Sequence, residues 1–215
     1  NVTAIEIDDF AINLINFNRA LNFKENEIKI INHDLFKFNY PQNHYDLITC
    51  NPPFVLIPDE FGGPLYAKGF GKDGLDHLRF LVKNAEFWLK NNGVAYYIVD
   101  LLGDDSNPFF IKELEKLASS SNIEITVFID NKLDARINIK ALTSICYNLN
   151  PEINRDVIRQ KVSTLIVKEL GASHYYLSTI MIAKNSNKNG LRIFNRQKFL
   201  TSDGKFKNVV SLPTT

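Results

Sequence analysis

The sequence predicts an α/β fold with a doubly wound, mostly parallel sheet. Short β-branched runs alternate with stretches whose apolar residues recur at helical spacing, beginning with residues 2–7, 27–32 and 45–50. Strands that alternate with helices build parallel sheets through right-handed crossovers. Polar residues also follow several of these strands, at the edge where doubly wound sheets bind their ligands.

Composition sets the broad class. The chain has 215 residues, 45% of them hydrophobic, which is enough for the core of one domain with an appendage. The net charge of +1 argues against a surface devoted wholly to nucleic acid, although a local basic patch is compatible with it. The two cysteines, Cys50 and Cys146, lack a CxxC spacing and are expected to be reduced core residues. With neither a membrane-spanning run nor a signal peptide in the sequence, we expect a cytoplasmic protein without a membrane partner.

The first half of the chain is expected to hold three strands, two helices and a long loop. Asp8 and Asp9 can cap a helix that follows the first strand and carries apolar residues up to Leu21. After the third strand, the Gly- and Pro-rich segment 52–74 predicts a functional loop. An amphipathic helix over 75–89 follows, ended by Asn92 and Gly93.

The second half predicts further strands at 94–99, 123–129 and 174–183. Pro108 marks the start of a helix between the first two. Residues 131–150 are ambiguous, with an additional strand suggested at 142–149, and a helix is expected from about 151 to 170.

Two carboxylates at strand ends predict a site for an adenosine cofactor. Glu6 ends the first strand and can accept both ribose hydroxyls, with Ile7 against the adenine ring. Asp34 follows the second strand and can accept a hydrogen bond from the adenine amino group, and Leu35 is placed in the same site. The simpler alternatives are a helix cap for Glu6 and a turn residue for Asp34. Neither residue separates a dinucleotide from other adenosine cofactors.

The turn Asn51-Pro52-Pro53-Phe54, directly after the third strand, is the most discriminating feature. Each proline fixes its own φ and biases the preceding residue toward extended geometry, so Asn51 and Pro52 are held rigidly. An Asn side-chain oxygen and a backbone carbonyl can together accept both hydrogens of a planar NH2 group. Such fixed acceptors stabilise the positive charge that develops on the nitrogen during methyl transfer, and Phe54 offers a stacking surface.

With these motifs, residues 2 to about 184 resemble the class I S-adenosylmethionine-dependent methyltransferases that carry Asn-Pro-Pro-Tyr/Phe. That branch methylates exocyclic amines of nucleobases or glutamine side-chain amides of proteins. Glu6 matches the family's ribose-binding acid, Asp34 its adenine-binding acid, and Asn51 to Phe54 its catalytic turn; Asn51 is also counted among the cofactor contacts. Gly71, Asp73, Gly74 and Leu75 resemble the segment after that turn in release-factor glutamine methyltransferases, and "NNGVAYYIV" resembles the next turn and strand.

The resemblance implies a Rossmann-like fold, S-adenosylmethionine as cofactor, and a protein or nucleic-acid substrate. It also implies a methyltransferase domain over 1–184, with an insertion at about 131–172 before the last, antiparallel strand. The family's first strand and glycine-rich loop have no counterpart in the sequence. We therefore expect an upstream segment of the same protein to supply them, between strands 2–7 and 45–50.

Other interpretations stay open. Glu6 could hold the ribose of NAD in an oxidoreductase, and a cofactor-binding module without catalysis would share the fold. Residues 185–215 form a basic extension in which Phe194, Phe199 and Phe206 are interleaved, a pattern seen at single-stranded nucleic-acid sites but also in solvated tails. The four histidines lack metal-ligand spacing, so we expect no metal.

Overall fold

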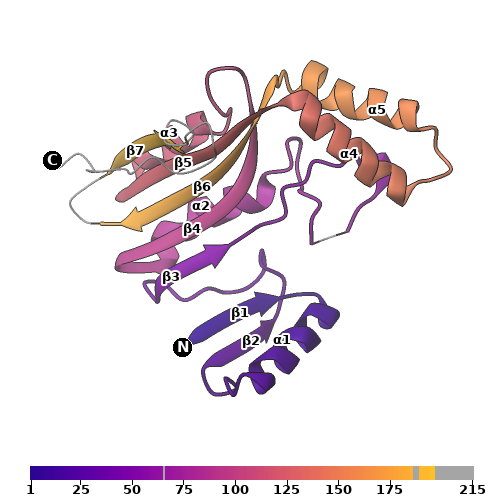
Figure 1. Ribbon diagram of the computed structural model, residues 1–215. Helices are drawn as coiled ribbons and strands as arrows, with labels where there is room; N and C mark the ends of the chain where they lie inside the picture. Colours follow the sequence, from indigo (N-terminus) through magenta and orange to yellow (C-terminus); the bar gives the residue numbers. More distant parts are fainter. Residues whose placement is uncertain (65, 186–188, 197–215) are drawn as a thin grey trace, which may run out of the picture. The chain divides into compact units, whose positions relative to one another are not determined.

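A computed structural model describes residues 1–64, 66–185 and 189–196 of the chain. The chain divides into two compact units, Asn1–Pro41 and the part from Gln42 onward, and each is described by itself. Both combine strands with helices, as predicted (Figure 1).

The first unit is a β-α-β element. Strands β1 (Val2–Glu6) and β2 (Ile28–Asn32) pair in parallel, with Glu6 opposite Asn32. Between them runs α1 (Asp9–Leu21), whose N-cap is Asp8: its side chain accepts a 2.8 Å hydrogen bond from the Ala11 backbone N–H. Several apolar side chains of α1 are exposed, among them Phe10 at 73% and Phe17 at 64%.

The second unit is built on a five-stranded mixed sheet with the order β3-β4-β6-β5-β7. Its strands are β3 (Tyr45–Cys50), β4 (Leu89–Gly103), β5 (Ile123–Asp134), β6 (His174–Lys184) and β7 (Gly190–Asn195). Strand β6 lies between β4 and β5 and is antiparallel to both, whereas β3 with β4 and β5 with β7 are parallel pairs. The prediction of an α/β fold whose late strand runs antiparallel is confirmed.

Helices α2 (Asp76–Trp88) and α3 (Ile111–Ser120) cover one face of this sheet, and Figure 1 shows both behind the strands. On that face Ala95, Tyr97 and Val99 of β4 are fully buried. Trp88 is buried as expected. The helix ends at Trp88 rather than near Asn92, because Leu89 already pairs with Tyr45 as the start of β4. Asn92 and Gly93 therefore form an irregularity within the strand, with Asn92 at a φ of 64°.

The segment between β5 and β6 folds into α4 (Ala135–Leu149), α5 (Arg155–Ser163) and a π-helical turn, η2 (Thr164–Glu169). The strand suggested at 142–149 is wrong: these residues continue α4. Asp134 caps that helix by accepting from the Arg136 backbone N–H, and Ile139, Leu142 and Cys146 recur at helical spacing on its buried side. The helix expected over 151–170 corresponds to α5 with η2.

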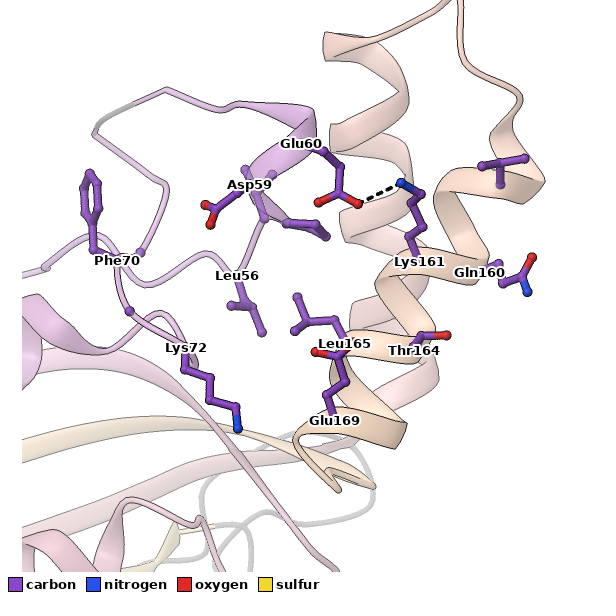
Figure 2. A pocket seen from close by; sticks show the side chains of 15 residues that line it. Leu56, Asp59, Glu60, Phe70, Lys72, Gln160, Lys161, Thr164, Leu165 and Glu169 are labelled. Atoms are coloured by element: carbon purple, nitrogen blue, oxygen red, sulfur yellow. Dashed lines mark hydrogen bonds and ion pairs between the residues drawn. The ribbon is translucent and has the colours of Figure 1, made fainter.

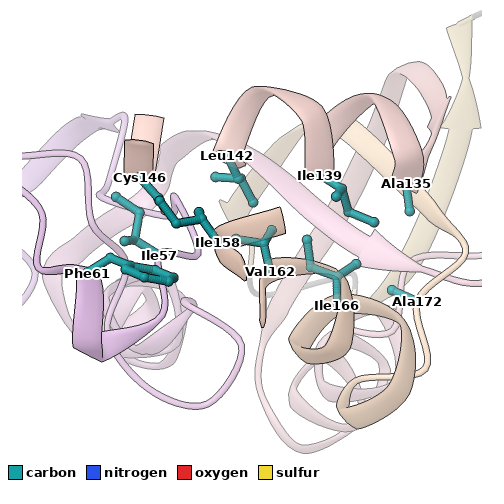
Figure 3. Packing of buried hydrophobic residues seen from close by; sticks show 10 residues of the cluster. All are labelled: Ile57, Phe61, Ala135, Ile139, Leu142, Cys146, Ile158, Val162, Ile166 and Ala172. Carbon is teal, nitrogen blue, oxygen red and sulfur yellow. The ribbon is translucent and has the colours of Figure 1, made fainter. Parts of the chain in front are cut away.

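These helices bury their apolar sides in a common cluster, shown in Figure 3. Leu142 and Cys146 of α4 join Ile158 and Val162 of α5. Ile57 and Phe61, which follow the Asn-Pro-Pro-Phe turn, complete the cluster, so it fastens the functional loop to the insertion.

The described part of the basic extension includes β7, a strand that the sequence did not predict. Phe194 stacks on Phe128 of β5 with ring centroids 5.6 Å apart. Arg196 lies 4.2 Å from the centroid of the Phe128 ring and forms a 2.9 Å ion pair with Asp130. Phe194 thus packs on the sheet, whereas Phe199 and Phe206 lie outside the described residues.

In the described ranges, β1 pairs only with β2, and β3 only with β4. The two strands predicted to flank an absent one, 2–7 and 45–50, do not pair with each other. None of the helices in these ranges is long and apolar enough to cross a membrane.

Candidate functional site

The Asn-Pro-Pro-Phe turn leaves the sheet directly after β3. Asn51 is exposed, Pro52 is buried and Phe54 is half-buried. The chain then folds back on itself: the Val55 backbone N–H donates to the Ala67 carbonyl, and the Val55 carbonyl accepts from the Gly69 N–H, both at 2.9 Å. The rigidity that the two prolines give the turn is thus continued by a closed loop, and Asn51 at the start of the turn is exposed.

The segment 69–75 packs its backbone directly against this turn. Gly74 has a φ of 80°, and a Cβ atom there would lie 3.1 Å from the Phe54 carbonyl oxygen. At Gly69 a Cβ atom would overlap the Gly74 carbonyl. Glycine is required at these two positions, which gives a physical reason for Gly74 in the segment Gly71–Leu75.

Asp73 anchors the same segment through Arg79 of α2. Its carboxylate accepts hydrogen bonds from the Leu75 backbone N–H at 3.2 Å and from both terminal nitrogens of Arg79, at 2.7 and 2.6 Å. Burial by itself would raise the pKa of Asp73, but the Arg79 guanidinium outweighs it and holds that pKa below its usual value. Arg79 also pairs with Glu113 of α3 at 2.8 Å. The loop beside the turn is therefore tied to both helices beneath the sheet.

Burial disfavours the thiolate form of both cysteines. Burial raises the pKa of Cys50 to about 11, and burial likewise raises that of Cys146 to about 11. Cys146 is fully buried, as expected, whereas Cys50 is only half-buried; both cysteines are free. In the described part of the chain, no cluster of three or more His, Cys, Asp or Glu side chains is arranged to hold a metal ion.

The first unit brings four of the five predicted cofactor residues to one edge, whereas the fifth, Asn51, belongs to the second unit. Glu6 and Asp34 follow the carboxyl ends of two adjacent parallel strands, and the His33 backbone N–H donates to the Glu6 carbonyl at 2.9 Å. One Glu6 carboxylate oxygen, Oε1, accepts from the backbone N–H groups of Ile7 and Asp8 at 2.8 and 3.0 Å. The helix cap itself is Asp8, so the local role of Glu6 is to hold the turn before the helix.

Asp34 likewise has a local role. Its Oδ1 accepts from the Phe36 backbone N–H at 2.8 Å, and its Oδ2 lies 3.2 Å from the Lys37 ammonium. The hydrogen bond from Phe36, helped by Lys37, holds the pKa of Asp34 below its usual value, so this carboxylate stays ionised. Ile7 is 59% exposed, whereas Leu35 is half-buried and its carbonyl accepts from the Tyr40 hydroxyl. Two fixed carboxylates and an exposed apolar side chain suit the hydroxyls, amino group and ring of an adenosine.

A cleft of about 750 Å³ opens beyond the turn, between residues 56–72 and the insertion (Figure 2). Leu56 and Leu165 contribute apolar surface, while Asp59, Lys72 and Glu169 contribute charges. The ion pair between Lys161 and Glu60, at 2.9 Å, joins the two walls. The sequence does not indicate the role of the insertion. The structure shows that it forms one side of this cleft.

A second cavity, of about 140 Å³, lies beside Phe54 and contains Asp100 of β4. Asp100 was not among the predicted site residues. The sequence does carry a signal for it, because Asp100 is an acid inside an otherwise apolar strand, "VAYYIVDLL". The alternation of side chains along a strand places it on one face of the sheet.

Comparison with known proteins adds independent information. No family model matches the chain. It is 32% identical over 101 residues to a ribosomal protein uL3 glutamine methyltransferase from Francisella tularensis, covering 44% of this chain and 32% of that protein. The corresponding protein of Neisseria meningitidis is 34% identical over 100 residues, covering 43% and 32%. A release factor glutamine methyltransferase from Thermodesulfovibrio yellowstonii is 31% identical over 104 residues, covering 44% and 36%.

The predicted resemblance to glutamine methyltransferases is thereby confirmed. The chain spans about a third of the length of these relatives. Among solved structures, an O-methyltransferase segment of StiE aligns at a TM-score of 0.48 and 17% identity, covering 86% of this chain and 60% of that one.

Proposed function

We propose that this chain belongs to an enzyme that transfers a methyl group from S-adenosylmethionine to the side-chain amide of a glutamine in a protein. The observation that carries the proposal is the Asn-Pro-Pro-Phe turn, held after β3 by its prolines and by the close approach of Gly74. The similarity to proteins named for glutamine methylation supports the amide over other planar amines.

The chemistry follows from the weakness of an amide nitrogen as a nucleophile, since its lone pair is delocalised into the carbonyl. The Asn51 side-chain oxygen and the Pro52 carbonyl accept the two amide hydrogens and orient the lone pair toward the methyl group. Fixed acceptors stabilise the positive charge that develops on the nitrogen. When bound, S-adenosylmethionine supplies a methyl group on a positively charged sulfur. An amide nitrogen that accepts this methyl group would release its surplus proton to water.

The size of the 750 Å³ cleft supports a polypeptide as the substrate. It continues from the loop that follows the turn, and it presents acidic and basic side chains on both walls, with apolar surface between them. A stretch of chain can lie in such a cleft, and Leu56, which lines it, is five residues from Asn51 in the sequence. Methylation of a nucleobase amine is the alternative, and the basic extension is the feature that favours it.

An upstream segment of the same protein completes the sheet in this proposal. Strand β3 has one partner among the described residues, and its Leu47 is 57% exposed. On the face of β4 turned away from α2, Tyr96 is 38% and Ile98 50% exposed. An additional strand would satisfy the open β3 edge, and its connection would cover this face.

The test is a methyl-transfer assay with labelled S-adenosylmethionine, run on the 215-residue chain and on the protein extended upstream. Ribosomal proteins and a release factor serve as candidate acceptors, with RNA alongside. The expected result is label on a glutamine amide, formed only by the extended protein. Label on RNA instead would favour the nucleobase alternative, and activity of the 215-residue chain would overturn the upstream proposal. Tight binding of NAD without binding of S-adenosylhomocysteine would favour the oxidoreductase.

The cofactor role of Glu6 gives a separate prediction. Glu6→Ala should weaken S-adenosylmethionine binding by about tenfold or more, because hydrogen bonds to a charged group contribute about 1.5–3 kcal/mol. Calorimetry on the extended protein measures this, with Glu27→Ala as the control, since Glu27 is an exposed acid of the same unit that pairs with Lys24. An unchanged dissociation constant would leave Glu6 with only its role in the turn before α1.

A further inference from the structure

The cavity beside Phe54 is lined by residues from several parts of the second unit. Phe54 and Leu56 come from the catalytic turn and its loop, Asp100 and Leu102 from β4, and Tyr175 from β6. Helix α4 covers it with Leu142 and Ile145. Apart from Asn138 and the acids, its walls are apolar or aromatic, so the polar groups inside it have few partners.

In the described part of the chain, Asp100 is the lining residue with an unsatisfied polar atom. It faces away from the side of the sheet where Val99 and Leu101 are buried, because side chains alternate along a strand. The Tyr175 hydroxyl donates to Asp100 Oδ2. Asp100 Oδ1 is buried and accepts no hydrogen bond from the described residues. A desolvated carboxylate oxygen without a donor is unfavourable, and a ligand that donates to it would remove that cost.

The charges around the cavity indicate which type of hydrogen-bond donor a ligand would present to Asp100. Its charged lining residues are two acids, Asp100 and Asp73. Asp73 is already engaged by Arg79, so Asp100 is the carboxylate left to pair with a ligand. Burial raises the pKa of Asp100, and the hydrogen bond from Tyr175 acts in the opposite direction. The same burial keeps competing water away, so a positive charge placed next to the ionised carboxylate would be attracted strongly and would favour that form.

We infer that this cavity binds a primary ammonium group on an unbranched alkyl stem, as in a lysine side chain close to the methylated residue of the protein substrate. An ammonium has three donors and no acceptor, which suits Asp100 together with the Asn138 amide oxygen. At roughly 30 Å³ per water-sized group, 140 Å³ holds about five such groups, the number of heavy atoms in a lysine side chain.

The position of the cavity fits a residue neighbouring the acceptor glutamine. Leu56 lines both this cavity and the 750 Å³ cleft, so a polypeptide lying in the cleft can direct a side chain past it. Phe54 lines the cavity, and Asn51 is three residues away in the same turn. The binding of an ammonium group does not depend on the proposed function. The identification of that group as part of the protein substrate does rest on it.

The test uses n-butylammonium as the probe on the protein extended upstream, and binding is followed by NMR of the side-chain carboxyl carbons. We expect a saturable shift of the Asp100 signal and a fall in the pKa of Asp100 when the probe is bound. The signals of Asp73 and the Tyr175 ring, the other titratable groups of the cavity, report whether either responds instead. Butyramide and n-butanol, which have similar length and no charge, should bind at least tenfold more weakly.

Asp100→Asn keeps the shape of the side chain and should reduce n-butylammonium affinity at least tenfold. The control is Asp105→Asn, which neutralises an acid that is 84% exposed and paired with Lys132 outside the cavity. Equal binding of the uncharged probes, an unchanged affinity in Asp100→Asn, or the absence of a saturable shift would each overturn the inference. S-adenosylmethionine binding to the extended protein is measured in parallel, so a failure of the ammonium site is distinguishable from a failure of the proposed function.

Discussion

Replacing Asn51 by alanine should lower the rate constant of methyl transfer by about 100- to 1,000-fold while leaving cofactor affinity within a few-fold. The Asn51 oxygen is proposed to act on the incoming amide, where charge develops as the N–C bond forms. Removing one preorganised group of this kind costs roughly 2.7–4 kcal/mol of transition-state stabilisation in enzymes that depend on such contacts. Single-turnover kinetics with the extended protein and its identified acceptor measure the effect on the chemical step.

The matched control is Asn43→Ala. Asn43 is also exposed, and it lies in the loop before β3 rather than after it, where its side-chain oxygen accepts from Lys184 at 2.6 Å. It should transfer methyl groups at nearly the normal rate. If Asn51→Ala retained the normal rate on the same acceptor, the turn would be a structural end to β3, and the site would have to be sought elsewhere.

The second large effect concerns stability. Phe61→Ala should lower the free energy of unfolding by about 3–5 kcal/mol, because Phe61 is only 4% exposed within the cluster that joins the loop to α4 and α5. The ring also lies 5.7 Å from the Lys161 ammonium, and the Phe61 carbonyl accepts from the Asn150 side chain at 2.9 Å. Losing the ring should therefore loosen the wall of the cleft as well as the core.

Urea denaturation measures the loss, and limited proteolysis of segment 55–72 shows whether the loop is released. Phe87→Ala serves as the control, since Phe87 is 47% exposed on α2, and it should change stability by less than about 1 kcal/mol. Similar losses in both variants would mean that the loop is not held by the cluster shown in Figure 3.

Local patterns predicted the parts of this protein whose structure depends on near neighbours in the chain. The alternation of strands and helices was correct for β1, β2 and β3 and for the helices that follow β1 and β3. The Asn51–Phe54 turn was predictable because proline restricts its own backbone and that of the residue before it. The motif from Gly71 to Leu75 could be recognised from sequence, but its reason, the contact of Gly74 with the Phe54 carbonyl, required coordinates.

Local sequence patterns gave wrong predictions where packing against distant segments decides the conformation. Residues 142–149 have β-branched and aromatic content that suits a strand, yet they form helix because Leu142 and Cys146 pack on Ile158 and Val162 from another helix. Strand β7 was missed for the same reason: its Phe194 is fixed by Phe128, more than sixty residues earlier.

By itself, then, the sequence determined the fold class, the rigid turn and the resemblance to methyltransferases that act on planar amines. These depend on hydrophobic period, proline geometry and residue order, all of which are written locally in the chain. Only the tertiary structure decided that the insertion forms the far wall of a cleft and that Asp100, an acid in an apolar strand, faces a cavity beside Phe54. Both are consequences of which segments pack together. Burial and pairing energies act between residues far apart in sequence, so no local pattern encodes them.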